Sequence, residues 1–274
     1  MRLIHLVVIW LAQAWEEHWP FSRGKGLAHR FHDFLFRLGL LKPFWTRIDG
    51  IFYLVDTRDH ISKFLVKQGA YEPYVVSKIL ENLPVSGVFV EVGAHIGSVT
   101  LKAARKVGSN GRVIAIEANP YTAQTLRANI EKNAIANITV MQEACSDNTG
   151  IIRLFLSSFM NIGKSSMSSA NAGSSNYVEV QTEPLDQIIR RAGITRCDLV
   201  KIDVEGAELK VLQGMRDTLE RYRPVLILEI IPDLISNCGS LPRDIPNFLS
   251  AYGYESQSIG ANDYLFVPDA IRES

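Results

Sequence analysis

The chain has 274 residues, of which 47% are hydrophobic and 21% charged, which is typical of globular domains rather than of disordered, collagen-like or coiled-coil chains. Lys plus Arg equal Asp plus Glu at 29 each, and a net charge of zero argues against a nucleic-acid-binding protein. The three cysteines, an odd number without C-x-x-C spacing, argue against a disulfide framework or a zinc site and favour a reducing compartment, so we expect a cytoplasmic protein.

The first 47 residues differ in composition from the rest. They hold seven Lys/Arg against three Asp/Glu, a net charge of +4, and all four tryptophans. We place a boundary near residue 47, between an N-terminal helical extension (1–47) and a main domain (48–274). Three interpretations of the extension remain open: helices that pack on the main domain, a basic aromatic element on a membrane surface, or a short signal peptide ending at Ala12-Gln13-Ala14.

A hairpin and two helices are expected before the first long apolar strand. Asp49-Gly50 lies between two apolar runs and predicts a β-hairpin over residues 48–55. Asp59 can cap a helix that runs to about Gln68 and ends at Gly69. Pro73 can open a second helix over residues 73–82.

From residue 88 onward the pattern alternates between apolar strands and helices. The strands are expected at 88–92, 112–117, 138–141, 199–203, 225–229 and 264–267. The helices are expected from the glycine turn to about 107, and at 120–133, 206–213 and 244–251. Such alternation predicts an α/β fold with a doubly wound, parallel sheet, in which ligands bind at the carboxyl ends of the strands.

One serine-rich stretch, residues 157–176, interrupts this alternation. It contains eight serines and two glycines and lies between two β-like runs at 151–156 and 177–180. We therefore expect a hairpin with a long tip. The tip is either a lid on the acceptor side of a site or a segment without a role.

A glycine turn lies where strand 88–92 meets its helix. Gly93 and Gly97 would let the backbone approach a ligand and let the helix pack closely on the strand. Glu117 ends the next strand, 20 residues after Gly97, and can accept hydrogen bonds from two ribose hydroxyls. The turn alone could be explained by packing, but together with Glu117 it indicates an adenosine-type ligand.

The residues of this turn also distinguish between adenosine ligands. His95 stands where a dinucleotide-binding G-x-G-x-x-G motif would have its second glycine, and no Gly-Lys-Ser/Thr follows as a P-loop would require. Glu91 would be poorly placed beside a pyrophosphate but well placed near an ammonium or a sulfonium. These features favour S-adenosylmethionine.

The sequence resembles the FkbM family of class I S-adenosylmethionine-dependent methyltransferases. The matching stretches are residues 69–73, 90–100, 116–120, 144–147 and 200–208. The resemblance covers roughly residues 50–268, with Glu91 where the family usually has Asp and His95 where it usually has Asn. It implies that residues 48–274 form a Rossmann-like methyltransferase domain with a mostly parallel, seven-stranded sheet, which transfers a methyl group to a hydroxyl of a sugar, glycolipid or related natural product.

The resemblance also implies which residues bind and react. The expected S-adenosylmethionine site comprises Glu91, Gly93, His95 and Gly97 around the methionine part, Glu117 at the ribose with Asn119 close by in the sequence, and Ser146 with Asp147 at the adenine rim. Asp203 and Glu205 end the fourth strand and are the expected catalytic residues, closest to the transferred methyl group.

The chemistry of methyl transfer agrees with a catalytic role for Asp203 and Glu205. A hydroxyl nucleophile must lose its proton, so a base must lie within hydrogen-bond reach, and two neighbouring carboxylates can raise one another's pKa. In the alternative, Asp203 caps the following helix and Glu205 is structural. These two acids and Glu229 could also ligate a metal through oxygen, although we expect none. His95 is a second candidate base, and we expect Lys201 to pair with one of the acids.

Two other functions compete with methyl transfer. A Rossmann-type nucleotide-binding oxidoreductase is disfavoured by the missing G-x-G-x-x-G motif. A catalytically inactive, membrane-attached scaffold is disfavoured because Glu91, Gly97, Glu117 and Asp203 are all present. The expected partner is a small-molecule or glycan acceptor, with no nucleic acid and with peripheral membrane contact as an option for residues 1–47.

Overall fold

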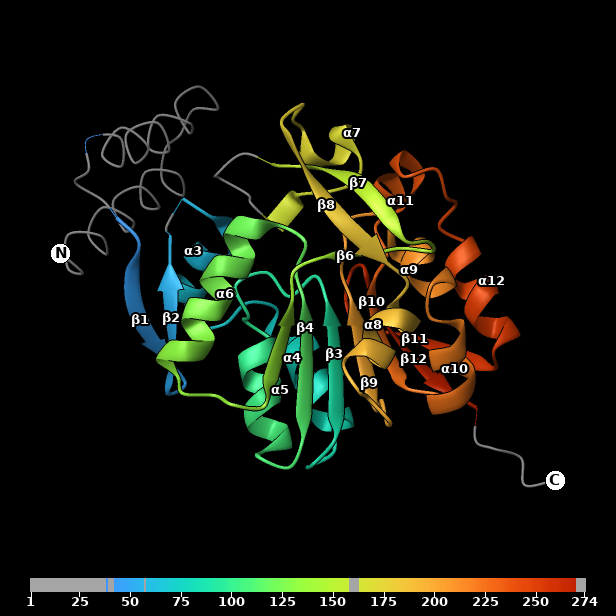
Figure 1. The fold of residues 1–274 in the computed structure, drawn as a ribbon, viewed down its shortest axis with the longest axis horizontal. Helices are drawn as coiled ribbons and strands as arrows, with labels where there is room; N and C mark the ends of the chain where they lie inside the picture. Colours follow the sequence, from blue (N-terminus) through green and yellow to red (C-terminus); the bar gives the residue numbers. More distant parts are fainter. Residues whose placement is uncertain (1–37, 39–41, 57, 158–162, 270–274) are drawn as a thin grey trace. The chain divides into compact units, whose positions relative to one another are not determined.

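The computed structural model describes residues 38, 42–56, 58–157 and 163–269 (Figure 1). These residues form two compact units, one up to Ala70 and the other from Tyr71 onward. The three interpretations of residues 1–47 fall almost entirely outside the described residues and stay predictions. Residue 47, near which the boundary is expected, lies in β1, and the two compact units meet at Ala70 and Tyr71; the division into an extension (1–47) and a main domain (48–274) stays a prediction.

The first unit contains the expected hairpin and helix. Its elements are β1 (Phe44–Ile48), β2 (Ile51–Val55) and α3 (His60–Gln68). The two strands pair antiparallel around Asp49 and Gly50, whose φ angles of 49° and 77° are those of the tight turn that Asp-Gly favours. Asp59 caps α3 by accepting a hydrogen bond from the backbone N–H of Ser62 at 2.9 Å, as its position in the sequence predicts.

The second unit is built on a seven-stranded sheet with the order β11-β12-β10-β9-β3-β4-β5. The strands are β3 (Val88–Val92), β4 (Arg112–Ile116), β5 (Ile138–Met141), β9 (Leu199–Ile202), β10 (Val225–Glu229), β11 (Tyr254–Ser258) and β12 (Asp263–Pro268). The strands β10, β9, β3, β4 and β5 run parallel, and β12 is antiparallel to both of its neighbours. The predicted doubly wound, mostly parallel sheet is confirmed.

Helices cover both faces of this sheet (Figure 1). They are α4 (Pro73–Asn82), α5 (Thr100–Val107), α6 (Pro120–Lys132), α8 (Leu185–Arg191), α9 (Glu208–Gln213), α10 (Arg216–Tyr222), α11 (Pro232–Asn237) and α12 (Asp244–Ala251). Strand β3 shows why both faces need cover: Val88, Val90 and Val92 pack in the core on the α8–α12 side, while Phe89 packs with α4 and α5. Because side chains alternate along a strand, Glu91 faces the same side as Phe89.

A separate three-stranded sheet interrupts the alternation; two of its strands form the hairpin that the sequence predicts, and the third, β6 (Ala144–Cys145), was not expected. The sheet consists of β6, β7 (Gly150–Phe155) and β8 (Tyr177–Glu183), in the order β6-β8-β7. Strands β7 and β8 form the expected antiparallel hairpin. Its long connection contains the short helix α7 (Ser169–Ala172) and, at Ser166, a two-way backbone pairing with Phe155.

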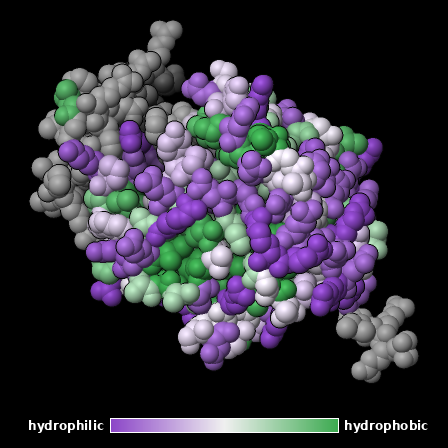
Figure 2. Space-filling model, viewed as in Figure 1, coloured by the Kyte–Doolittle hydropathy of each residue, from purple (hydrophilic) through white to green (hydrophobic). Residues whose placement is uncertain are grey.

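The face of the molecule in Figure 2 is mostly polar. Large exposed apolar side chains are spread over several elements of the second unit, among them Tyr74, Tyr121, Ile151 and Val267. Scattered exposure of this kind is normal for a globular surface. Within the described part of the chain, every helix is too short or too polar to cross a membrane.

Candidate active site

The glycine turn after β3 is shaped by close contacts within the protein. A Cβ on Gly93, whose φ is +91°, would lie 1.9 Å from the carbonyl oxygen of Asp203. A Cβ on Gly97, whose φ is +88°, would lie 2.5 Å from Cδ1 of Leu126 on α6. Both glycines are therefore required by conformation and packing, and the turn lies directly against the backbone of Asp203. Contact of either glycine with a ligand stays a prediction.

Glu117 joins the glycine turn to the end of β4. Its Oε2 accepts a hydrogen bond from the backbone N–H of His95 at 2.7 Å, and its Oε1 accepts one from the backbone N–H of Asn119 at 2.8 Å. A carboxylate oxygen can accept two hydrogen bonds, so among the described residues each oxygen retains one position for a ribose hydroxyl. The donor and acceptor pattern at the end of β4 thus fits the ribose of S-adenosylmethionine.

Two further residues of the expected cofactor site have defined local roles. Asn119 caps α6 by accepting a hydrogen bond from the backbone N–H of Tyr121 at 3.0 Å, and its Nδ2 donates to Ser165 at 3.3 Å. His95 adopts a left-handed φ of +50°, which histidine tolerates better than most residues. Both ring nitrogens of His95 are buried and lack a hydrogen-bond partner in the described part of the chain. A polar ligand at the turn would satisfy such orphaned atoms.

Glu91 lies deeper in the protein than its neighbours in the turn. Its side chain is buried, accepts a hydrogen bond from the hydroxyl of Thr100 on α5, and lies opposite Lys201 in the β3–β9 register. Burial raises the pKa of Glu91 to about 7, although Lys201 and Thr100 oppose this shift. The carboxyl group is thus held by α5 and β9, and its contact with the methionine part of S-adenosylmethionine stays a prediction.

Ser146 and Asp147 follow β6, in the smaller sheet, rather than β5. Ser146 is buried and its hydroxyl donates to Oδ1 of Asp147 at 2.9 Å, while Asp147 itself is exposed. The backbone N–H of Ser146 donates to the carbonyl of Glu183 in β8. The two residues are thus held at the edge of the smaller sheet, and a role at the adenine rim stays a prediction.

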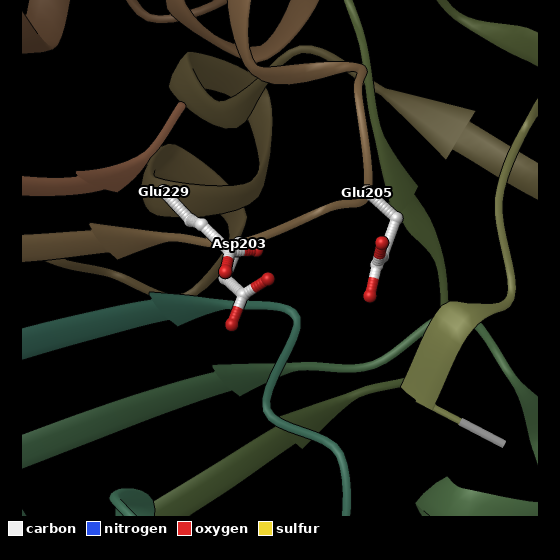
Figure 3. A group of neighbouring side chains, drawn as sticks. All are labelled: Asp203, Glu205 and Glu229. Atoms are coloured by element: carbon white, nitrogen blue, oxygen red, sulfur yellow. The ribbon is translucent and has the colours of Figure 1, made fainter. Parts of the chain in front are cut away.

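Three acids meet at the carboxyl ends of β9 and β10. Asp203 and Glu205 follow β9, Glu229 ends β10, and one carboxylate oxygen of each lies within 4.8 Å of the others (Figure 3). Lys201 is 5% exposed, and its Nζ lies 2.7 Å from Oδ2 of Asp203, which confirms the expected ion pair. The structure therefore brings the two predicted catalytic acids together and adds Glu229, which the sequence suggested only as a metal ligand.

The three acids differ in what surrounds them. Burial, followed by the negative charge of Asp203, raises the pKa of Glu205 to about 8. Burial and the charges of Asp203 and Glu205 also raise the pKa of Glu229. Asp203, in contrast, is engaged by the ammonium group of Lys201. Glu205 is therefore the acid of the predicted pair that is best placed to take up a proton near neutral pH.

The alternative in which Asp203 caps the next helix is wrong. Helix α9 begins at Glu208 with Ala207 at the cap position. The preceding turn is closed instead by Glu208, whose Oε1 accepts from the backbone N–H groups of Val204 and Gly206 at 3.2 and 3.1 Å. Sequence reasoning missed this role because a Glu at the start of a helix usually remains exposed, whereas Glu208 is 1% exposed.

Further acidic and phenolic groups lie near Lys201 and were not expected from the sequence. Glu72 and Tyr71 precede α4, and Asp263 begins β12. Burial raises the pKa of Glu72 and of Asp263, and Lys201 opposes the rise in both. The only sign of these groups in the sequence was that residues 69–73, which include Tyr71 and Glu72, match the FkbM family. The three acids at β9 and β10 could hold a divalent cation through oxygen, although Lys201 already supplies positive charge to Asp203.

Comparison with protein families identifies the chain. The family model of the methyltransferase FkbM domain matches residues 91–256, more than half of the sequence. The chain belongs to the FkbM methyltransferase family. It is a methyltransferase that uses S-adenosylmethionine, and this membership decides against the oxidoreductase and the inactive scaffold.

Individual relatives are distant. The hexuronic acid methyltransferase AglP of Haloferax volcanii is 27% identical over 179 residues, 65% of this chain and 68% of that protein. Methyltransferase sdnD of Sordaria araneosa is 27% identical over 165 residues, 50% of this chain and 63% of that protein. The crystal structure of methyltransferase FkbM from Methylobacillus flagellatus KT is 19% identical with a TM-score of 0.45, covering 87% of this chain and 70% of that one.

Proposed function

We propose that the protein transfers a methyl group from S-adenosylmethionine to a hydroxyl oxygen of a sugar, glycolipid or related natural product. The observation that carries this proposal is Glu205, a half-buried carboxyl group beside Asp203 and Glu229 at the carboxyl edge of the sheet. Ligands of doubly wound folds bind at this edge. When bound, S-adenosylmethionine supplies an activated methyl group on a sulfonium.

Glu205 is proposed as the general base. A base works best when its pKa is close to the working pH, and burial beside Asp203 raises the pKa of Glu205 to about 8. Asp203, whose carboxylate lies 2.7 Å from Lys201, is next to Glu205 and contributes to the raised pKa of Glu205. Glu117, with one free acceptor position on each oxygen, is proposed to hold the ribose hydroxyls.

A sugar acceptor is supported by one relative. AglP is named for action on a hexuronic acid, and it is similar to 65% of this chain. A hexuronic acid offers both hydroxyl and carboxylate oxygens as methyl acceptors. The proposal commits to a hydroxyl because a carboxylate nucleophile has no proton to lose and would need no base.

Label transfer tests this proposal. The full chain is incubated with methyl-labelled S-adenosylmethionine and, in separate reactions, with a neutral hexoside, a hexuronic acid and an amino sugar glycoside. We expect label in an alkali-stable methyl ether. Label that mild alkali releases would identify a carboxylate ester and contradict the proposal.

The base is tested by Glu205→Gln, with the exposed Glu179→Gln as the matched control. Loss of general-base help should lower turnover by about 10²–10⁴-fold, while S-adenosylmethionine affinity measured by calorimetry stays close to that of the parent. In the parent, turnover should rise with pH through about 8, since Glu205 must lose its proton to act, and this limb should vanish in the variant. Parental turnover in Glu205→Gln would exclude Glu205 as the base.

A further inference from the structure

The backbone turn that carries Glu205 is held by side chains from a distant part of the sequence. Oγ of Ser166 donates a hydrogen bond to the carbonyl oxygen of Glu205 at 2.8 Å. Nδ2 of Asn171 donates to the same oxygen at 2.9 Å and to the carbonyl oxygen of Leu234 at 2.9 Å. Ser166 is 1% exposed and Asn171 is 8% exposed. Both belong to the serine-rich stretch, for which the sequence offered no definite role.

The turn needs such support because its conformation is unfavourable. Glu205 has a φ of +54°, in the left-handed region that a glutamate rarely adopts, and Gly206 follows with a φ of +108°. A Cβ on Gly206 would lie 2.3 Å from the carbonyl oxygen of Leu234 and 2.8 Å from Nδ2 of Asn171. Strained residues of this kind persist only where their surroundings determine the conformation, and they concentrate at functional sites.

The amide of Asn171 is itself held in one orientation. Nδ2 of Asn237 donates to Oδ1 of Asn171 at 2.9 Å, which leaves the two N–H groups of Asn171 for the two carbonyl oxygens. Ser166 is anchored by backbone hydrogen bonds with Phe155 in both directions, at 2.8 and 3.1 Å. Ser166 and Asn171 therefore form a rigid support rather than an incidental contact.

We propose that Ser166 and Asn171 are positioning residues that hold the Glu205 carboxyl group at the acceptor side of the site. Glu208 holds the N–H groups of the turn, and these two residues hold its carbonyl oxygen, so the turn is fixed from both sides. Their importance for catalysis rests on the proposed function of Glu205 as the base. Their effect on the environment of the Glu205 carboxyl group does not depend on that proposed function, and this effect can be measured without an acceptor.

The first measurement is a pH titration of the Glu205 carboxyl carbon by NMR, with isotope-labelled glutamate and with Glu205→Gln to assign the signal. The charged groups near Glu205 are Asp203, Glu208, Glu229, Lys164 and Lys201. None of them is altered in Ser166→Ala, which removes one oxygen atom, or in Asn171→Ala. We expect the Glu205 midpoint, near 8 in the parent, to move toward the ordinary value of 4.5 in both variants, because a loosened turn admits water. The buried Glu91 should titrate as in the parent.

The second measurement is turnover with whichever hexoside accepts label. Ser166→Ala should lower kcat about fivefold, the effect of one hydrogen bond, and the Ser166→Ala/Asn171→Ala double variant by about 10²-fold. S-adenosylmethionine affinity should not change. In a Glu205→Gln background the same substitutions should have no further effect on kcat, because they act through Glu205. The exposed Ser169→Ala is the matched control.

The outcomes separate this inference from the proposed function. A Glu205 titration in both single variants that superimposes on the parent would overturn the positioning role. The positioning role would also be overturned if Ser166→Ala and Asn171→Ala lowered kcat further in the Glu205→Gln background, since they would then act independently of Glu205. Parental turnover of Glu205→Gln together with a shifted titration would remove the base role and leave the support of the turn intact.

Discussion

Asp203 and Glu205 are close neighbours, yet their side chains have different partners. The carboxylate of Asp203 lies 2.7 Å from the buried ammonium of Lys201, whereas Glu205 lies among other acids. Lys201 is 5% exposed, so its charge depends on its carboxylate partners. The ion pair of Asp203 with Lys201 therefore stabilises the fold and also sets the charge of the site.

From this contrast we predict that Asp203→Asn and Glu205→Gln differ in stability. Asp203→Asn should lower the free energy of unfolding by about 3 kcal/mol, because it breaks a buried ion pair. This value is at the lower end of the usual cost, since Glu72 and Glu91 remain near Lys201 and still offset its charge. Glu205→Gln should leave the free energy of unfolding nearly unchanged or raise it, because it removes a half-buried acid that lies among other acids. Urea unfolding of both variants checks this, and equal stability of the two would contradict the ion-pair argument.

Glu117 is expected to contribute to the binding of S-adenosylmethionine. Glu117→Gln should weaken S-adenosylmethionine binding by roughly tenfold or more, since a charge-assisted hydrogen bond contributes about 1.5–3 kcal/mol. The melting temperature should fall too, because a Gln amide would face a backbone N–H of His95 or Asn119. Calorimetry measures the affinity, and Glu179→Gln serves as the control, since Glu179 is an exposed residue of β8. Parental affinity would exclude Glu117 from the ribose site.

Elements that sequence patterns specify locally were predicted well. Helices α4 and α12 have the predicted bounds, and the hairpin turns at Asp49-Gly50 as predicted, because turn residues and caps act within a few positions. The first strand of the hairpin was missed, since it begins at Phe44 rather than at residue 48. The seven-stranded sheet followed from its continuous apolar strands and the family resemblance. The short helices α8, α10 and α11 and the polar strand β11 were missed, since none carries a long periodic pattern.

Contacts between distant elements could not be predicted from sequence. Ser166 and Asn171 bind the Glu205 carbonyl across 39 and 34 residues, and nothing in a run of serines distinguishes the one that does so. The glycine turn was predicted by its position, but its closest neighbour, the carbonyl of Asp203, lies 110 residues away in the sequence. Gly93 is therefore fixed by packing between β3 and the end of β9, and Gly97 by packing against Leu126 on α6, before any ligand is considered.

The close packing of β3 against the end of β9 should make Gly93 important for stability. Gly93→Ala should lower the free energy of unfolding by about 3 kcal/mol or more, because the added methyl group would lie 1.9 Å from the Asp203 carbonyl and φ is +91°. Gly150→Ala in β7 is the control, since its Cβ would meet nothing within 4 Å. Urea unfolding measures both. If Gly93→Ala proved as stable as Gly150→Ala, the close approach of β9 to the turn would be wrong.

For the molecule as a whole, buried carboxyl groups determine how stability depends on pH. Burial raises the pKa of Glu91 and of Glu208 to about 7 and that of Glu205 to about 8, from an ordinary value of 4.5. Between these values the folded state binds more protons than the unfolded state. The stability associated with these groups is fully present below about pH 4.5 and is lost as the pH rises through 7 and 8.

We therefore predict that the free energy of unfolding falls as the pH rises from about 5 to about 9, the reverse of the behaviour of a protein dominated by ion-paired carboxylates. We expect the ion pair of Asp203 with Lys201 not to reverse this, because burial outweighs the charge of Lys201 at Glu91 and Glu205 and the backbone hydrogen bonds at Glu208, and leaves the pKa of all three acids raised. Urea unfolding across this range measures the slope. In Glu205→Gln the slope between about pH 7 and pH 9 should be shallower than in the parent, because the variant lacks the group with the pKa of about 8. A free energy that rises with pH would show that these acids are ionised in the folded protein, and it would remove the basis for a base that loses its proton near pH 8.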